Sequence, residues 1–190
     1  MTKQRTCKQC KVRFDEDDGV RTPAGRFCGA PHAFQWAIKR RDANKAKALR
    51  AQQRARKEAA LTNTEWANKL QIEVNKYVRL RDKADGCISC DKPATWAGQF
   101  HASHFYSRGH SSALRFNLWN LHRACSQCNN HLSSNHEGYA PALVEKIGQE
   151  RVDWLTAHKS DVVRRDAEWY KRAIRIARRG IKRLERHHSP

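Results

Sequence analysis

The spacing of the cysteines constrains this chain more than any other feature of its sequence. Six of the seven form Cys-x-x-Cys pairs, which are Cys7–Cys10, Cys87–Cys90 and Cys125–Cys128, and Cys28 lies outside them. The chain shows no apolar run of the signal-peptide type near its first residues, so this spacing favours metal binding over disulfides. Each pair predicts a tight turn whose two thiolates meet one Zn²⁺ ion from the same side.

The two later pairs predict a closed zinc site made of Cys87, Cys90, Cys125 and Cys128. Four thiolates leave no open coordination position, so this zinc is expected to be structural. It would hold together a segment that is too small to be stable through burial alone. Buried free thiols or a redox pair are the alternatives, but a redox Cys-x-x-Cys needs a βαβ context that this segment lacks.

The first pair, Cys28 and His32 have the spacing of a site with three thiolates and one imidazole. Such a site explains the odd number of cysteines. Phe14 and Phe27 would form the small core of this N-terminal knuckle. The alternative for His32 is a surface histidine beside Pro31, and the role of the knuckle is left open between docking on DNA, docking on a partner and capping the next helix.

Two segments rich in Lys and Arg are predicted to be helices. Residues 38–60 carry nine basic and two acidic side chains without an apolar stripe, which is typical of a solvated or DNA-facing helix. A second helix is expected from Thr62, which has capping-box spacing to Glu65, to about Gly86. The last helix is expected from about Asp161, capped by Ser160. Its apolar positions suit a seam with another helix, within the chain or in a homodimer: Tyr170, Ile174, Ala177, Ile181 and Leu184.

The charge of the chain indicates a polyanionic partner. Lys and Arg total 38 against 19 Asp and Glu, which gives a formal net charge of +19. No apolar stretch is long enough to span a bilayer, so nucleic acid is the expected partner, bound through phosphates and with steep salt dependence. The residues expected to contact DNA are Arg40, Arg41, Lys45, Arg50, Arg54, Arg108, Arg115, Arg172, Arg175 and Arg179.

The segment between the central pairs carries residues suited to phosphodiester hydrolysis. His104 lies in the strand-like run 99–106, Asn120 precedes the last pair, and Asn129 directly follows it. This register matches the HNH pattern of a ββα-metal nuclease core. A neutral imidazole takes a proton from water, and Mg²⁺ or Mn²⁺ stabilises charge on the phosphate and leaving group. His104 is therefore predicted as general base, Asn129 as metal ligand and Asn120 as a residue that pins the hairpin. Taken singly, a histidine on a strand or an asparagine near a helix start is more often structural.

Several runs in this segment resemble the phage NinG (Rap) recombination proteins. They are His104-Phe-Tyr-Ser-Arg-Gly109, Leu114-Arg-Phe-Asn117, Asn120-Leu-His122, Cys125-Ser-Gln-Cys-Asn129 and Leu132-Ser-Ser-Asn135. The N-terminal cysteines and basic helix also fit that family. The resemblance implies a phage-encoded, structure-specific endonuclease that cuts Holliday junctions and D-loops in the cytoplasm of the bacterial host, with His104 and Asn129 as catalytic positions and other recombination proteins as possible partners.

Ser103 departs from the HNH pattern. Many HNH enzymes have an Asp or His metal ligand at the position before the base, and a serine hydroxyl is a poor ligand for Mg²⁺. His101 lies two residues earlier on the same strand face, and His122 lies three residues before Cys125. We expect one of these two to complete the catalytic site. Trp119 and Phe116 are expected in the core rather than as platforms for bases.

These inferences together predict a mainly α chain with a small zinc-stapled, HNH-like ββα-metal core. The predicted segments are a knuckle (1–36), a basic helical region (37–85), the nuclease core (86–137) and a second basic helical region (138–190). Two structural Zn²⁺ ions and a catalytic Mg²⁺ or Mn²⁺ are expected. Symmetric junction cutting favours a homodimer. Alternatives are a non-catalytic zinc-finger nucleic-acid-binding protein, an HNH nuclease of another specificity and a structural adaptor.

Overall fold

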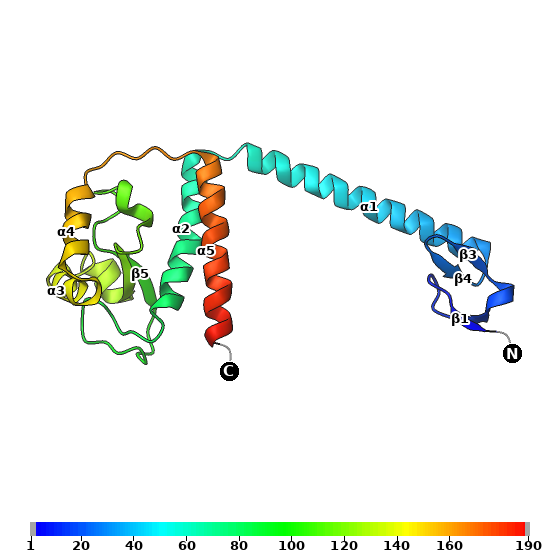
Figure 1. The fold of residues 1–190 in the computed structure, drawn as a ribbon, viewed down its shortest axis with the longest axis horizontal. Coiled ribbons are helices and arrows are strands. Elements are labelled where there is room, and N and C mark those ends of the chain that lie inside the picture. Colours follow the sequence, from blue (N-terminus) through cyan, green and yellow to red (C-terminus); the bar gives the residue numbers. More distant parts are fainter. Residues whose placement is uncertain (1–2, 189–190) are drawn as a thin grey trace. The chain divides into compact units, whose positions relative to one another are not determined.

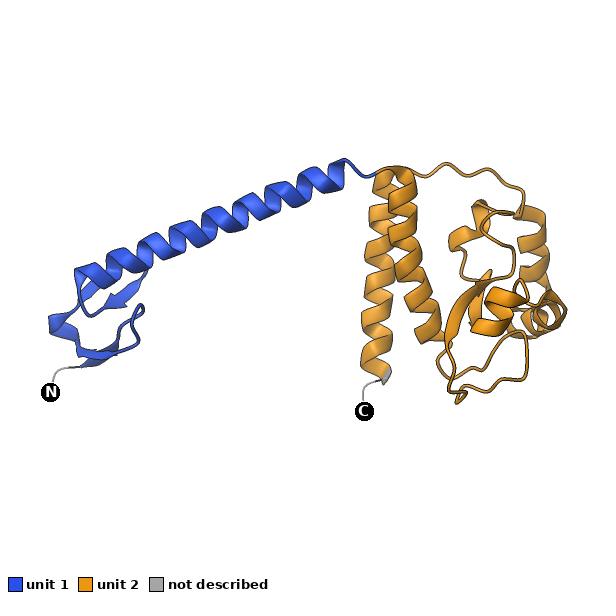
Figure 2. Ribbon diagram, turned by 180° about the vertical axis from the view of Figure 1, so that it is seen from behind, with its two compact units in different colours: residues 1–61 blue, residues 62–190 orange. Residues whose placement is uncertain are grey.

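The chain folds into two compact units. The computed structural model describes residues 3–188 (Figure 1), and Figure 2 colours the two units, residues 1–61 and 62–190, separately. The finer division into four segments stays a prediction. The structure is mainly helical with three small antiparallel sheets of two strands each among the residues it describes.

The first unit is a pair of hairpins followed by a long helix. Strand β1 (Gln4–Thr6) pairs with β2 (Arg13–Asp15), the 3₁₀ turn η1 (Glu16–Asp18) follows, and β3 (Val20–Thr22) pairs with β4 (Gly25–Phe27). Helix α1 (Ala30–Ala59) begins earlier than the predicted residue 38. Pro31 lies in its first turn, where the missing N–H costs nothing. Phe27 is buried, and the ring of Trp36 packs on it at 5.7 Å.

Most of α1 has no packing partner within its unit. Every residue from 41 to 60 is exposed. The segment therefore matches the predicted solvated helix, whose composition rather than burial supports its helical state.

The second unit begins with helix α2 (Asn63–Arg81). The predicted capping box is present, because the Thr62 side chain accepts from the Glu65 N–H and the Glu65 carboxylate accepts from the Thr62 N–H. The helix ends at Arg81, earlier than the predicted Gly86. Asp82 follows the helix and accepts a hydrogen bond from the backbone N–H of Arg123 at 3.1 Å, which ties the helix end to strand β6 (Leu121–Cys125).

Helices α2 and α5 (Ala167–His188) run side by side in the same direction (Figure 1). Ion pairs join the helices, Glu73 with Arg178 and Lys76 with Glu185. Both residue numbers increase from the first pair to the second, as expected for parallel helices. Tyr170, Ile174 and Ile181 of the predicted seam are buried. Helix α2 thus occupies the seam within the chain, so the seam leaves no reason to invoke a homodimer.

Helix α5 begins at Ala167, and the prediction of a start at Asp161 with Ser160 as cap is wrong. Residues 161–166 have no regular structure. The carboxylate of Asp166 accepts the backbone N–H of Trp169 at 2.7 Å, so this aspartate caps the helix instead.

A β-hairpin and two short helices complete the second unit. Strand β5 (Phe100–His104) pairs antiparallel with β6 (Leu121–Cys125), and η2 (Ala113–Phe116) lies between them in sequence. The short helices are α3 (His136–Ile147) and α4 (Gln149–His158). Their core holds the buried side chains of Phe105, Leu114, Tyr139, Leu143 and Leu155.

Trp119 lies at the surface, contrary to the prediction that it is core. Its side chain is 37% exposed, and it meets Trp154 edge to face at 5.6 Å. Phe116 is partly buried against Tyr170 of α5. In the part of the chain that the structure describes, no helix is both long and apolar enough to cross a bilayer.

Candidate metal centres and candidate active site

The N-terminal cluster brings together the four residues predicted from spacing. Cys7 and Cys10 flank the turn after β1, Cys28 follows β4, and His32 lies in the first turn of α1. The Cys10 and Cys28 sulfurs are 3.7 Å apart, and the His32 Nδ1 atom is 2.9 Å from the Cys28 sulfur and 4.0 Å from the Cys7 sulfur. Four ligands about 2.3 Å from one Zn²⁺ ion in a tetrahedron lie about 3.8 Å apart. The cluster therefore fits a zinc ion.

The central cluster has the same fit with four sulfurs. All ligand atoms of Cys87, Cys90, Cys125 and Cys128 lie within 4.8 Å of one another, and Cys90 Sγ is 3.9 Å from Cys125 Sγ. Backbone N–H groups point at two of the sulfurs: that of Cys125 donates to Cys87 at 3.2 Å, and that of Cys128 donates to Cys125 at 3.4 Å. Such N–H donors stabilise thiolates, so this cluster can also bind structural zinc.

The shifted pKa values of the thiols suit a cation in each cluster. Burial alone raises the pKa of Cys7, but N–H donors from Cys10, Cys28 and Gln9 outweigh it and lower the pKa from 9.0 to about 6. Burial and neighbouring thiols raise the pKa of Cys28 to about 11, and the same causes raise that of Cys128. Adjacent thiolates repel each other, so only a bound cation allows all of them to ionise together.

His32→Ala is expected to weaken zinc binding at the N-terminal site while the central site stays loaded. The variant removes one ligand of four and leaves three thiolates, so the affinity of this site should fall at least about 100-fold. Zinc release into a graded series of chelator concentrations measures the two sites separately. His110→Ala, which changes an exposed histidine, is the matched control. Unchanged release from both sites in His32→Ala would show that His32 is a surface residue.

His101 and Asn129 meet beside the central cluster. His101 lies on β5, and Asn129 follows Cys128 in the short π-helical turn η3 (Gln127–His131). The Asn129 amide nitrogen is 3.2 Å from His101 Nδ1. Both side chains are partly exposed to solvent. An imidazole nitrogen and a carboxamide oxygen are both metal ligands, so these two residues could hold a metal ion together.

His104 does not contact Asn129. Its described hydrogen bond joins Nε2 to the Arg115 carbonyl at 3.0 Å. In the strand register, His104 lies opposite Leu121 and His101 lies opposite Ala124, so the two histidines project from opposite faces of the hairpin. Burial is the main cause that lowers the pKa of His104 from 6.5 to about 4. His104 is therefore a neutral imidazole at the end of β5.

His122 is buried inside the unit and does not join the His101–Asn129 pair. Its Nδ1 atom is 3.2 Å from the Tyr139 hydroxyl, and burial lowers its pKa to about 3. The same hydroxyl donates to the Ser103 carbonyl. Of the two candidates for the second metal ligand, the structure favours His101. Tyr139 organises this network but carries no sequence signal beyond being an aromatic residue in a helix.

Ser103 is also buried and holds the loop after η3. Its hydroxyl donates to Ser134 Oγ at 3.0 Å, and the Ser134 hydroxyl donates to the His104 carbonyl at 3.1 Å. Ser103 thus braces the hairpin against the loop that carries Asn129, rather than reaching solvent as a metal ligand would.

Asn120 joins the two ends of the hairpin, the role that the sequence predicts for it. Its side chain is fully buried; it accepts the Tyr106 N–H at 2.8 Å and donates to the Tyr106 and Leu114 carbonyls. It therefore positions the residues after His104 and does not itself face substrate.

The element after the second knuckle differs from the α-helix that follows the hairpin in a ββα-metal core. The π-helical turn η3 is followed by Ser133, Ser134 and Asn135, all with positive φ. The Asn135 side chain donates to the Ser89 carbonyl at 2.6 Å, and the backbone N–H of Ser134 bonds to the Cys128 carbonyl. These bonds stabilise the irregular backbone, so α3 starts only at His136. The ββα-metal core stays a prediction.

Nine of the ten residues predicted to contact DNA are exposed. They are Arg40, Arg41, Lys45, Arg50 and Arg54 on α1, Arg108 after β5, and Arg172, Arg175 and Arg179 on α5. The last three line, with Arg178, a groove of about 430 Å³. Such clusters suit phosphate binding.

Arg115 is the exception among these residues. Its guanidinium donates to Gln71 at 3.1 Å and to Asn68 at 3.0 Å, both on α2. These bonds hold η2 against α2. Arg115 therefore stabilises the fold, which the sequence did not reveal.

The chain is similar to phage proteins along most of its length. A family model described as "Bacteriophage Lambda NinG protein" matches residues 1–187. Protein ninG of Escherichia phage 933W is 30% identical over 169 residues, which cover 82% of this chain and 81% of that protein. Protein ninG of Escherichia phage lambda is 36% identical over 103 residues, covering 54% of this chain and 50% of that protein. No solved structure gives a significant match.

Proposed function

This chain belongs to the NinG family of bacteriophage proteins, and we propose that it is a metal-dependent endonuclease of the HNH type that cuts branched DNA. The proposal covers Holliday junctions and D-loops as substrates. The observation that carries it is the contact between His101 and Asn129 at the edge of the central four-thiolate cluster.

The His101–Asn129 pair supplies two neutral ligands for Mg²⁺ or Mn²⁺. The structural zinc would fix Asn129 through its neighbour Cys128, and the β5–β6 pairing would fix His101, so neither ligand needs to be ordered when substrate binds. A divalent cation in this position would stabilise the negative charge that develops on the phosphate and on the leaving oxygen.

His104 is proposed as the general base. Its Nε2 donates to the Arg115 carbonyl, which leaves Nδ1 as the free acceptor. With its pKa lowered to about 4, the ring is neutral at pH 7 and ready to take a proton. An approaching phosphate would raise that pKa toward neutrality and strengthen the base. His104 is the last residue of β5, so the proposal requires the scissile phosphate to lie across the end of the hairpin, between the faces that carry His104 and His101.

The second candidate function is DNA binding without catalysis. The opposite orientation of His104 and His101, together with the buried Ser103, favours it. In that case the central zinc would only support a basic surface that recognises branched DNA through its phosphates.

Cleavage of a four-way junction separates the two functions. Wild type is expected to nick the junction when Mg²⁺ or Mn²⁺ is added, and to cut a linear duplex of the same sequence at least about tenfold more slowly. The control omits the divalent ion rather than adding EDTA, because EDTA would also extract structural zinc. Binding without any nicking in either ion would overturn the nuclease and favour the second function. Equal cutting of junction and duplex would overturn only the preference for branches.

A further inference from the structure

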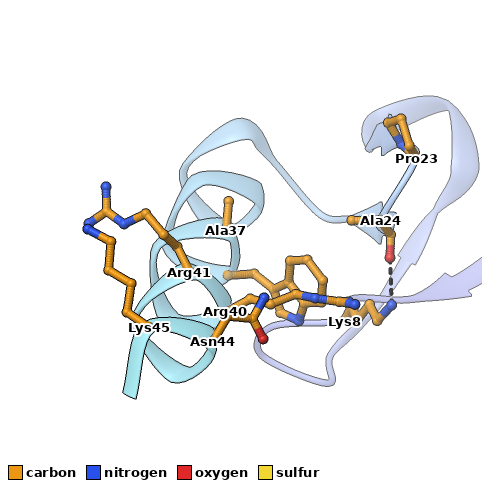
Figure 3. A pocket seen from close by; sticks show the side chains of 9 residues that line it. Lys8, Pro23, Ala24, Ala37, Arg40, Arg41, Asn44 and Lys45 are labelled. Atoms are coloured by element: carbon orange, nitrogen blue, oxygen red, sulfur yellow. Dashed lines mark hydrogen bonds between the residues drawn. The ribbon is translucent and has the colours of Figure 1, made fainter. Parts of the chain in front are cut away.

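A basic groove in the first unit lies between the N-terminal zinc hairpin and helix α1. It has a volume of about 780 Å³, and its lining includes Lys8, Arg40, Arg41 and Lys45. Figure 3 shows Lys8 joined to the Ala24 carbonyl on the hairpin side of the groove, with Arg40, Arg41 and Lys45 on the helix. The remaining lining is Pro23, Ala24, Trp36, Ala37 and Asn44, so no carboxylate lines the groove.

Trp36 holds two of these cations in place. The Lys8 ammonium lies 4.8 Å from the centre of its indole ring, and the Arg40 guanidinium lies 4.9 Å from it. Lys8 also donates to the Ala24 carbonyl at 2.5 Å. Cation–π contacts restrict these long side chains before any ligand arrives, so less entropy is lost when an anion binds.

The zinc cluster sets the position of Lys8. This residue lies between Cys7 and Cys10 in the knuckle, and its backbone N–H donates to the Arg26 carbonyl at 3.1 Å. His32 joins the same cluster from the first turn of α1, one turn before Trp36. A zinc ion held by Cys7, Cys10, Cys28 and His32 would clamp the hairpin to the helix at the base of the groove.

The charge pattern favours an extended polyanion over a compact acidic ligand. Beyond the groove, Lys47 and Arg54 follow Arg40 at steps of seven residues along α1, and all three are exposed. Seven residues are two helical turns, so the charges continue on roughly one side of the helix for about 20 Å. A nucleic-acid strand carries a charge about every 3.4 Å, so cations about 10 Å apart on the helix can contact phosphates at intervals along an extended strand.

We infer that this groove is a second DNA site, in which Lys8, Arg40, Arg41 and Lys45 bind the phosphates of a strand and the N-terminal zinc serves to build it. The inference rests on the proposed function only in taking DNA as the ligand. It gives the N-terminal zinc unit a binding role that needs no catalytic residue of the second unit.

The test compares two triple variants of the full chain that remove the same charge from the same unit. Lys8→Gln/Arg40→Gln/Lys45→Gln changes the groove, and Lys11→Gln/Arg13→Gln/Arg21→Gln changes exposed cations outside it. Junction affinity is measured without added divalent ion across a salt series. The groove variant should bind at least about tenfold more weakly, and its slope of log K against log salt should become about 2 to 3 units less negative, because each phosphate neutralised contributes about 0.9. The control variant should change affinity less than about twofold.

Zinc content of two ions per chain and an unchanged circular dichroism spectrum establish that both variants fold. Equal losses of junction affinity in both variants would show that net charge, and not the groove, binds DNA. Wild-type junction affinity in both variants would also overturn the inference. Wild-type DNA affinity with lost binding to poly(L-glutamate) in the groove variant would assign the groove to an acidic protein instead. A chain that binds through the groove but never cuts DNA leaves this inference intact and overturns only the nuclease.

Discussion

Asn129→Ala is expected to lower the rate of Mg²⁺-dependent junction cleavage at least about 100-fold without changing junction affinity. The side chain contacts His101 and lies on a partly exposed turn, so its removal takes away one metal ligand and creates no buried cavity. His101→Ala should have an effect of similar size. Because the two ligands act on one ion, the double variant should cut about as slowly as either single variant. Single-turnover cleavage of a labelled four-way junction measures all three.

The neighbouring Asn130 offers a matched control. It is exposed and bonds only the Asn129 amide in the described contacts, so Asn130→Ala should cut within about threefold of wild type. His104→Ala tests the base separately: the rate should fall about 100-fold or more, and raising the pH should restore part of it, because hydroxide then replaces the missing proton acceptor. Full cleavage by Asn129→Ala and His101→Ala would remove this pair from the mechanism. If only His104→Ala lost cleavage activity, the catalytic metal would have to be assigned to the hairpin face that carries His104.

Local spacing explains which parts of the fold are predictable from the sequence. The two ligands of a zinc knuckle lie in one tight turn with two residues between them, so the spacing of Cys7–Cys10 and Cys125–Cys128 predicts their geometry directly. The capping box at Thr62 is equally local, and the structure has it. Each cluster contains at least one such local pair, and the structure brings together the ligands predicted for both. The N-terminal cluster has three thiols and one imidazole and the central cluster has four thiols, although the halves of each cluster are far apart in the chain.

The candidate site is harder to predict because it depends on strand face and on irregular backbone. A shift of one residue in the β5–β6 register would move each side chain to the other face, so the register decides whether His101 or His104 faces Asn129. The sequence alone does not specify this register. The turn η3 and the left-handed residues 133–135 set where Asn129 points. The exposure of Trp119 and the contacts of Arg115 with α2 are hard to predict for a related reason. Packing with α4 and α2 decides them, and no short pattern encodes that packing.

Cys128→Ser is expected to unfold the core of the second unit. The thiol is buried, and its neighbours Cys125 and Asn135 bond within the same cluster. Zinc binding contributes on the order of 10–16 kcal/mol in small zinc-dependent domains, which is comparable to the whole net stability of a typical protein, roughly 5–15 kcal/mol. Losing one ligand should therefore leave β5, β6 and η3 without enough stabilisation to stay ordered.

Zinc content and limited proteolysis together measure this effect. Cys128→Ser should hold one zinc per chain instead of two, and protease should cut within residues 87–135 at least about tenfold faster than in wild type. Cys10→Ser is the matched control, because it should also lose one zinc while this segment stays resistant. Both variants should lose one ion, but only one should lose the hairpin that carries His101 and His104. If Cys128→Ser kept wild-type resistance, hydrogen bonds such as those of Asn120 would be sufficient to hold the hairpin, and the central zinc would have no structural role.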